Sequence, residues 1–416
     1  YGDHRDLHSF PTRRSSDLWH SLYSTQKELE EKKIPLYYIL INILIGALLG
    51  IVYTNDVFNA FVFIEISSLA ASGIVVIKDK KENIKAALKY LILSSVGSGL
   101  VLMAIAFVYS FTGNLNMTFI NKEVIKMADL YSKSILIALG LFTAGLGVKS
   151  AMFPMHVWLP DAHSNAPSTS SAILSSLVLK AYVILYIKIL YRVFGYNIVK
   201  SYPILDMVLI LGSLGMIMGS VLAILQKDIK RTIAYSSVAQ MGYIFFGIGL
   251  GNTLGLVSAI FHILNHAVVK SSLFLVSGAI IEKTGEKKII GLKGIGKEMP
   301  ITLGIFTIGA LSMVGIPLLP GFISKFNFAL ASIDSGKSIL VLIILASSLL
   351  NALYYFPIVI NGYFGEENLN GKVLREKELS INRLLPLLVL VVGILYLGIA
   401  SGGVIDILNA SLVLGD

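Results

Sequence analysis

Seven ionisable side chains lie within apolar stretches of this 416-residue chain. They are Glu65, Lys149, Lys180, His262, His266, Lys270 and Lys325. An ionisable group at the centre of a bilayer costs about 2.5–3.5 kcal/mol on insertion scales, so each is a functional candidate. Three of them, His262, His266 and Lys270, are spaced four residues apart, which places them on one face of a helix. Such a set is suited to binding and passing on protons.

Glu65 and Lys149 are candidates for an ion pair within the membrane. Burial disfavours the charged form of lysine or glutamate, whereas a neighbouring opposite charge favours it. A lysine that gains and then loses a carboxylate partner therefore takes up and releases a proton. Histidines, with an unperturbed pKa of about 6.5, are suited to relaying it. Two plainer interpretations stay open here: the pair only fixes helix packing, and His262 is an ordinary hydrogen-bonded core histidine.

The composition indicates an integral membrane protein. Hydrophobic residues make up 55% of the chain and charged residues only 14%, whereas soluble domains carry about 25% charged residues. The chain has no cysteine, which excludes disulfides and thiolate-held iron–sulfur clusters. We therefore expect no cofactor, no metal and no redox site of its own. The net charge of +9 lies in short loops between apolar segments, where it sets orientation in the membrane, so we expect no binding to nucleic acid.

The predicted fold class is an all-α membrane protein with eleven transmembrane helices. A helix needs about 20 apolar residues to cross a bilayer. Segments of this kind begin near residues 35, 57, 86, 134, 168, 204, 230, 253, 301, 338 and 384. Most lysines and arginines fall in alternate loops, around residues 78–89, 227–231, 283–297 and 372–383. The excess of basic residues predicts that these loops are cytoplasmic.

Two of these segments should be interrupted helices. The fourth contains Pro154 and Pro160, and the ninth contains Gly315, Pro317 and Pro320. Proline removes a helix hydrogen bond, and in a membrane the freed carbonyls must be satisfied by protein or by a water-lined cavity. Interrupted helices in corresponding positions are typical of inverted-repeat transporters, whose sites lie at the breaks. We predict two inverted five-helix repeats, roughly 57–192 and 204–365.

The remaining features are interpreted more simply. Residues 1–18, YGDHRDLHSFPTRRSSDL, are polar and lack the apolar stretch of a signal peptide, so we interpret them as a non-native, adapter-derived tail. Residues 19–34 form a charged lead-in, and residues 35–416 form the transmembrane domain. Serines within the spans are interpreted as close-packing positions. Asp161 and His163 resemble a metal-binding pair without further ligands, so we expect a structured loop there.

Three segments carry a resemblance to a known family. The strings VKSAMFPMHVWLPDAHSNAPSTSSAILSSLVLK, HILNHAVVKSSLFLVSGAI and GFISKF closely resemble the antiporter-like subunits of respiratory complex I, membrane-bound hydrogenases and Mrp-type sodium/proton antiporters. The chain looks more similar to the middle subunits of complex I (NADH-quinone oxidoreductase) and to the Mrp D subunit. Family members have about fourteen helices, so the resemblance implies an N-terminal truncation.

The resemblance also implies roles for the seven residues. Glu65 and Lys149 match the family's ion pair, and Lys180 matches the lysine that bridges to the centre. His262, His266 and Lys270 match the central relay, and Lys325 matches the exit residue, which is a glutamate in some members. The function implied is proton translocation across the cell membrane, with neighbouring subunits that supply redox energy or a sodium gradient.

Two other classes of function stay open from the sequence. One is a stand-alone secondary transporter of an organic substrate, built on the same inverted repeats. The other is a quinone-binding or purely structural membrane subunit.

Overall fold

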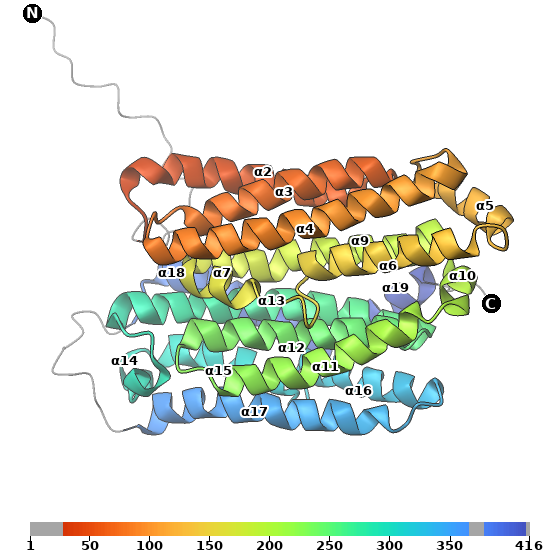
Figure 1. Ribbon diagram of the computed structural model, residues 1–416. Helices are drawn as coiled ribbons and strands as arrows, with labels where there is room; N and C mark the ends of the chain where they lie inside the picture. The colour runs from red at the N-terminus through yellow and green to blue at the C-terminus, as the bar shows by residue number, and fades with distance from the viewer. Residues whose placement is uncertain (1–27, 366–377, 413–416) are drawn as a thin grey trace, which may run out of the picture.

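The computed structural model describes residues 28–365 and 378–412, and within these ranges the chain forms helices and no strand. The 1–18 tail lies outside the described residues, and the lead-in is described only from residue 28. The long helices run side by side, with α2, α3 and α4 at one edge of the bundle and α17 at the other (Figure 1). The predicted all-α membrane fold is confirmed.

Nine helical runs in the described residues are long and apolar enough to cross a membrane. They are α2 (Ile34–Tyr53), α3 (Val57–Val76), α4 (Lys81–Thr112), α6 (Ser132–Lys149), the run from α8 to η4 (Ser168–Phe194), α11 (Ile204–Ile224), α13 (Thr253–Thr284), α17 (Leu340–Phe364) and α18 (Ile381–Ile399). They coincide with nine of the eleven predicted segments.

Helix α12 (Ile229–Gly249) matches a further predicted segment, although it is less apolar than the nine. It packs backbone to backbone against α11. A Cβ added at Gly212 would lie 2.5 Å from the Phe246 nitrogen, and one at Gly242 would lie 2.5 Å from the Met216 nitrogen. Small residues allow helices in membranes to approach this closely. The polar residues of α12 are therefore enclosed by protein rather than by lipid, since nearly the whole helix is buried.

Both predicted helix interruptions are present. Helix α6 ends at Lys149, and a short helix, α7 (Leu159–Asn165), follows with Pro160 in its first turn. Helix α15 (Pro300–Val314) ends at Gly315, whose φ of 95° is left-handed, and α16 (Pro320–Asp334) begins at Pro320. Proline is tolerated in a first turn because its missing N–H would have no helical partner there. The pair α15 and α16 accounts for the last of the eleven segments.

The same local construction occurs twice in the bundle. Helices α4 and α13 each contain 32 residues and end at a left-handed glycine. The residue before α3 is bridged to the loop after α4 through Asp56 and Asn116, and the residue before α12 is bridged to the loop after α13 through Asp228 and Lys288. Each of these aspartates also caps its helix.

The two bridges lie at opposite ends of the bundle (Figure 1). Helix α5 (Met117–Met127) directly follows the first bridge, and α14 (Ile295–Glu298) lies shortly after the second. The two helices appear at the right and left ends of the view, respectively. The two similar bridges, with the helices that follow them, therefore lie at opposite ends of the bundle.

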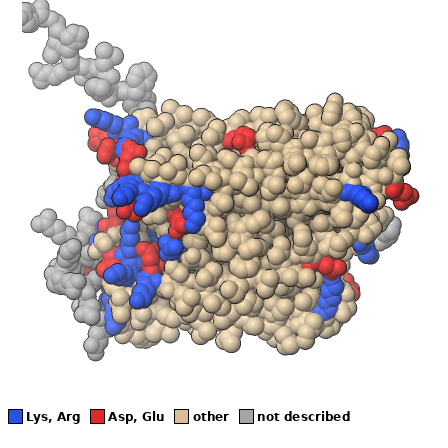
Figure 2. All heavy atoms as spheres, in the orientation of Figure 1, with Lys and Arg blue, Asp and Glu red and all other residues tan. Residues whose placement is uncertain are grey.

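Charged side chains gather at one end of the visible face, and the middle of that face is almost free of them (Figure 2). This end, called the basic end below, contains the turn from α3 into the start of α4, the start of α12 and the loop after α13. The basic residues of these segments are Lys78, Lys80, Lys81, Lys85, Lys89, Lys227, Lys230, Arg231, Lys287, Lys288 and Lys293. The predicted basic loops thus share one end, except for 372–383, which lies largely outside the described residues.

Candidate functional site

The structure brings Glu65 of α3 close to Lys149 at the end of α6. The Lys149 Nζ lies 3.9 Å from the Glu65 Oε1, and the lysine side chain is only 1% exposed whereas that of the glutamate is 39% exposed. The Lys149 ammonium donates hydrogen bonds of 2.6 Å to both Ser68 and Ser94. The Glu65 Oε1 accepts no hydrogen bond from a described residue. The serines therefore hold the ammonium, and the carboxylate acts on it across a longer gap.

Lys180 occupies the centre of the bundle. It lies on α9 (Leu179–Lys188), is 4% exposed, and donates a short hydrogen bond to the Ser175 carbonyl. Ser175 belongs to η3 (Leu174–Val178), a π-helical turn, and π-bulges inside α-helices frequently occur at functional sites. Lys180 is close enough to interact electrostatically with His266 and Lys270. It therefore lies near the ionisable side chains of α13.

The two histidines of α13 differ in their surroundings. His262 bonds through Nδ1 to Ser324 at 2.9 Å and through Nε2 to Gln240 at 3.0 Å. His266 stacks on His262 with ring centroids 6.2 Å apart, is fully buried, and has both nitrogens without a hydrogen-bond partner among the described residues. The ordinary core interpretation fits the bonds of His262 but not His266. A buried imidazole with both nitrogens free can take a proton without first breaking a protein hydrogen bond.

Lys270 and Lys325 are both buried and held by neutral acceptors. The Lys270 Nζ donates to the Ile233 carbonyl at 2.9 Å, to Ser236 and to Tyr355 at 3.3 Å. The Lys325 Nζ donates to the Met313 carbonyl at 2.8 Å and the Val314 carbonyl at 2.9 Å. Both carbonyls belong to the last turn of α15, where a helix end leaves acceptors unused. The second helix interruption therefore supplies the hydrogen-bond acceptors of Lys325.

The serine ligands were not foreseen from the sequence. The packing interpretation does not describe Ser68, Ser94 and Ser236, because their hydroxyls accept hydrogen bonds from Lys149 or Lys270. A serine that only packs and a serine that binds a lysine differ in which side chain of a neighbouring helix they face, and the sequence does not give that position.

His163 is a further candidate that sequence reasoning missed. It lies in the short helix α7 rather than in a loop, is fully buried, and has both ring nitrogens without a partner among the described residues. Its ring stacks on Phe274, and it interacts electrostatically with Lys180, Lys230 and Lys270. The sequence feature that could have identified His163 as a candidate is its position directly after the first interrupted helix.

Asp161 does not act with His163 as a metal pair. Its carboxylate instead accepts from Lys89 at 2.7 Å and from Arg231 at 3.2 Å. In the described part of the chain, no group of three or more His, Asp or Glu side chains could hold a metal ion.

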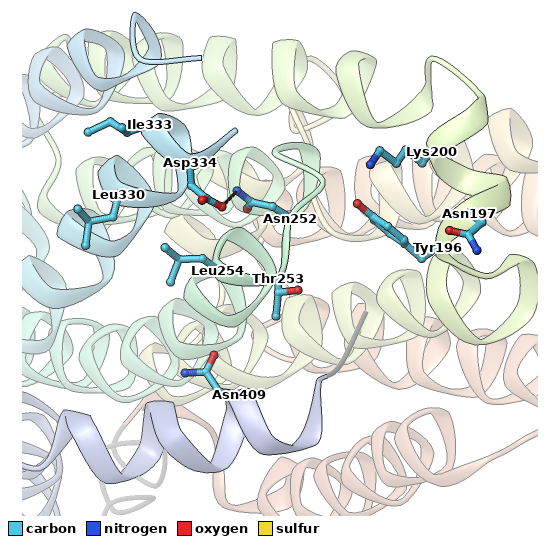
Figure 3. Close-up of a pocket in the computed structure, with 10 residues that line it drawn as sticks. All are labelled: Tyr196, Asn197, Lys200, Asn252, Thr253, Leu254, Leu330, Ile333, Asp334 and Asn409. Carbon is cyan, nitrogen blue, oxygen red and sulfur yellow. Dashed lines mark hydrogen bonds between the residues drawn. The ribbon is translucent and has the colours of Figure 1, made fainter. Parts of the chain in front are cut away.

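A pocket of about 890 Å³ opens at the end opposite to the basic end (Figure 3). It lies between α10 (Tyr196–Ser201), the start of α13, the end of α16 and α19 (Ser401–Ser411). Asn252 caps α13 and donates to Asp334 at 3.0 Å. None of the seven predicted residues lines this pocket. Its nearest link to them is α16, along which Asp334 lies roughly 13 Å beyond Lys325.

Comparisons with known proteins agree with this architecture. Residues 54–351 match the family model described as NADH:quinone oxidoreductase/Mrp antiporter, TM. The chain is 36% identical over 385 residues to NADH-quinone oxidoreductase subunit N of Desulforudis audaxviator, covering 89% of this chain and 75% of that protein. It is 30% identical to the D subunit of the Na(+)/H(+) antiporter of Alkalihalophilus pseudofirmus, covering 88% and 72%.

Solved structures give the same result. The membrane-bound sulfane sulfur reductase, an archaeal respiratory membrane complex, contains a chain that matches with a TM-score of 0.82 and 30% identity, covering 90% of this chain and 75% of that one. The Mrp complex from Dietzia sp. has the same fold, with a TM-score of 0.82 at 24% identity, covering 89% and 76%. The resemblance stated from sequence motifs is confirmed. This chain belongs to the NADH:quinone oxidoreductase/Mrp antiporter transmembrane family.

Proposed function

We propose that this chain translocates protons across the cell membrane as one subunit of a complex I-like or Mrp-type assembly. The similar proteins named above are subunits of NADH-quinone oxidoreductase and of Na(+)/H(+) antiporters. The observation that carries the proposal is the series of buried lysines and histidines that runs through the helix bundle from Lys149 to Lys325. Buried ionisable groups in membranes commonly mark proton relays.

In the proposed sequence of steps, Glu65 controls the proton affinity of Lys149. When the carboxylate is near, the ammonium is favoured; when it moves away, Lys149 passes its proton toward Lys180. The relay of His262, His266 and Lys270 then carries the charge into the second half. Lys325 releases it toward the end opposite to the basic end, where the pocket at Asp334 opens.

We further propose that the two halves are inverted repeats, formed by α2 to α9 and by α11 to α17. The repeated bridges, the equal lengths of α4 and α13 and the two interrupted helices support this division. It includes α2 in the first repeat, which the sequence-based boundary at residue 57 left out.

The energy for translocation would come from neighbouring subunits. The chain has no cysteine to hold an iron–sulfur cluster, so electron transfer or a sodium gradient would act on it through its membrane partners. The basic end would face the cytoplasm, following the excess of lysine and arginine there.

Proton transport by Lys149→Ala tests the proposal. Membrane vesicles containing the intact complex would be compared for acidification with a pH-sensitive dye. Alanine removes the buried ammonium of the Glu65–Lys149 pair, so transport should be abolished while the complex still inserts and assembles. Lys85→Ala, an exposed lysine of the basic end, is the matched control and should pump normally. Normal pumping by Lys149→Ala would refute the mechanism.

Two other readouts address the alternative functions. Uptake of an organic solute by the purified chain alone in proteoliposomes would favour a stand-alone transporter. Labelling of this subunit by a photoreactive quinone analogue would favour a quinone site. Neither result is expected, because the axis of the bundle is occupied by hydrogen-bonded lysines.

A further inference from the structure

A second pocket, of about 690 Å³, opens at the basic end between α11, α12, α17 and η5 (Ile289–Leu292). Three lysines line it: Lys227, Lys288 and Lys293. None of them forms an ion pair with another described residue. The pocket is separate from the proton path, since none of the seven residues assigned above lines it.

The lining of this pocket is positively charged. Its described lining residues include three lysines and no aspartate or glutamate. The acidic residues beside these lysines in the sequence, Asp228 and Glu286, do not line the pocket and accept backbone N–H groups, of Arg231 at 2.9 Å and of Lys288 at 2.7 Å.

Part of the lining is apolar and exposed. Ile224, Leu353 and Ile290 form this part, with exposed fractions of 37%, 53% and 68%. Exposed apolar side chains on spanning helices such as α11 and α17 face the hydrocarbon of the bilayer. The pocket thus combines a cationic rim at headgroup level with an apolar groove that is continuous with the membrane.

Both parts of the pocket are held in place by hydrogen bonds. Backbone bonds from Ile229 to the Lys287 carbonyl, at 3.0 Å, and from Ile289 to the Lys227 carbonyl, at 2.9 Å, join the two lysine-bearing loops. On the wall, Tyr354 donates to Asn351 at 2.7 Å. Ligand sites are usually preformed in this way, and a preformed site loses less entropy on binding.

We propose that this pocket binds a phospholipid with an anionic headgroup. The phosphate would lie among Lys227, Lys288 and Lys293, because ammonium groups form strong, charge-assisted hydrogen bonds to phosphate oxygens. One acyl chain would follow Leu353 and Ile224 along the groove between α11 and α17. The inference does not depend on proton translocation and goes beyond the proposed function.

Native mass spectrometry of the full chain in its membrane complex tests the headgroup contact. The complex would be titrated with phosphatidylglycerol and with zwitterionic phosphatidylcholine. The wild type should bind phosphatidylglycerol preferentially. The triple variant K227Q/K288Q/K293Q should bind it on the order of 100-fold more weakly, given the attraction of each lysine for anionic lipid. Equal binding of the two lipids by the wild type would overturn the proposal.

The control variant is K80Q/K81Q/K85Q, which removes the same charge from the same end of the molecule but not from this pocket. It should retain phosphatidylglycerol at the wild-type level. If both triple variants lose the lipid equally, the effect is only one of overall charge, and the assigned site is wrong.

The acyl-chain groove is tested without changing charge. Leu353→Trp should fill the groove and displace the lipid, whereas Leu349→Trp, one turn away on α17 and outside the pocket, should not. Both positions are exposed, so both variants should fold. Unchanged binding by Leu353→Trp would refute the groove assignment. A photoreactive residue at Ile290 that cross-links to a neighbouring subunit, and not to lipid, would assign the pocket to a protein partner instead.

Discussion

Each of the two interrupted helices has a buried lysine near its break, before the first break and after the second, and the surroundings of the two lysines differ. Lys149 ends α6 and has a carboxylate 3.9 Å away, that of Glu65. Lys325 lies within α16 and has two backbone carbonyls and the ring of Tyr243, 5.0 Å from its Nζ. Among the described residues, Lys325 has no carboxylate within ion-pair distance. At the first break the lysine is paired with a carboxylate, and at the second break the lysine is bound by neutral carbonyl groups.

This difference suggests separate tasks for the two halves. A carboxylate on a mobile side chain can approach or leave Lys149 and so change its proton affinity. The carbonyls of Met313 and Val314 belong to the backbone of α15, so the affinity of Lys325 changes only if the break itself moves. We infer that movement of Glu65 changes the proton affinity of Lys149 in the first half, whereas Lys325 is a fixed outlet in the second half. The predictions below test this contrast, from the largest expected effect to the smallest.

Replacement of the second lysine should have the largest effect. Lys325→Ala leaves the carbonyls of Met313 and Val314 without a donor and removes the titratable group, so proton transport should be abolished. Lys325→Glu should retain measurable transport, because a protonated carboxyl can donate one hydrogen bond to the same carbonyls. Dye acidification in vesicles with matched amounts of complex gives both rates. Equal rates for the two variants would show that the outlet does not need a titratable group.

Removal of the carboxylate should have a smaller effect. Glu65→Gln makes the surroundings of Lys149 neutral, as they are at Lys325. The Lys149 Nζ and the Glu65 Oε1 are 3.9 Å apart, beyond hydrogen-bond distance, so we assign the pair an energy of about 1 kcal/mol. We expect the rate of transport to fall roughly fivefold, with Glu65→Asp intermediate. An unchanged rate for Glu65→Gln would remove the proposed switch and leave the two halves equivalent.

Loss of one neutral acceptor should have a modest effect. Tyr355→Phe removes the weakest of the three acceptors of Lys270, at 3.3 Å, together with the 2.9 Å hydrogen bond between Tyr355 and Ser236. The Ile233 carbonyl and Ser236 still accept from Lys270. A hydrogen bond as long as the one from Lys270 to Tyr355 is worth about 0.5 kcal/mol, the low end of the net range, so transport should slow roughly twofold. Tyr363→Phe, on the same helix near its end, is the matched control. If both variants slow equally, the effect comes from α17 and not from Lys270.

Much of the fold could be predicted because the membrane imposes simple rules. Length and apolarity located the spans, and prolines located both interruptions, since a backbone in hydrocarbon must satisfy its own hydrogen bonds. Helix α7 was missed because its seven residues, with Pro160 at the start, carry no apolar period. The π-helical turn at Ser175 was missed for a similar reason, because one extra residue in a turn leaves no mark on composition.

The candidate site was predicted in its residue types but not in its contacts. Lysines and histidines in apolar spans are rare enough to identify individually. Their ligands are not, because serines such as Ser68 and Ser94 are common in spans and differ from packing serines only by their position across the bundle. His163 was assigned to a loop, and its burial could not be predicted. The packing of its ring against Phe274 of α13, with both ring nitrogens lacking a partner among the described residues, is seen only in the folded structure.

At the basic end the two halves are alike, since each has a carboxylate paired with a cation. Glu28 pairs with Lys78 beside the first half, and Glu282 pairs with Arg383 beside the second. Burial raises the pKa of the Glu28 carboxyl, but Lys78 and then Lys230 lower it, and the net pKa is below its ordinary value of 4.5. The stability that Glu28 contributes is therefore present above pH 4.5 and is lost as the pH falls through the lower folded pKa.

The smallest predicted effect follows from this pair. Glu28→Gln should lower the free energy of unfolding at pH 7 by about 1.5–3 kcal/mol, the range for a hydrogen bond to a charged group. The difference from the wild type should shrink as the pH falls below 4.5, because the wild-type carboxyl is then protonated first in the unfolded state and, at lower pH, in the folded state. Thermal unfolding of the purified protein in detergent at pH 7 and pH 3.5 measures both values. Glu31→Gln, an exposed carboxylate in the same lead-in, should change neither. A difference for Glu28→Gln that persists unchanged at pH 3.5 would mean that glutamine disturbs packing, and that the charge of Glu28 does not anchor this end of the first half.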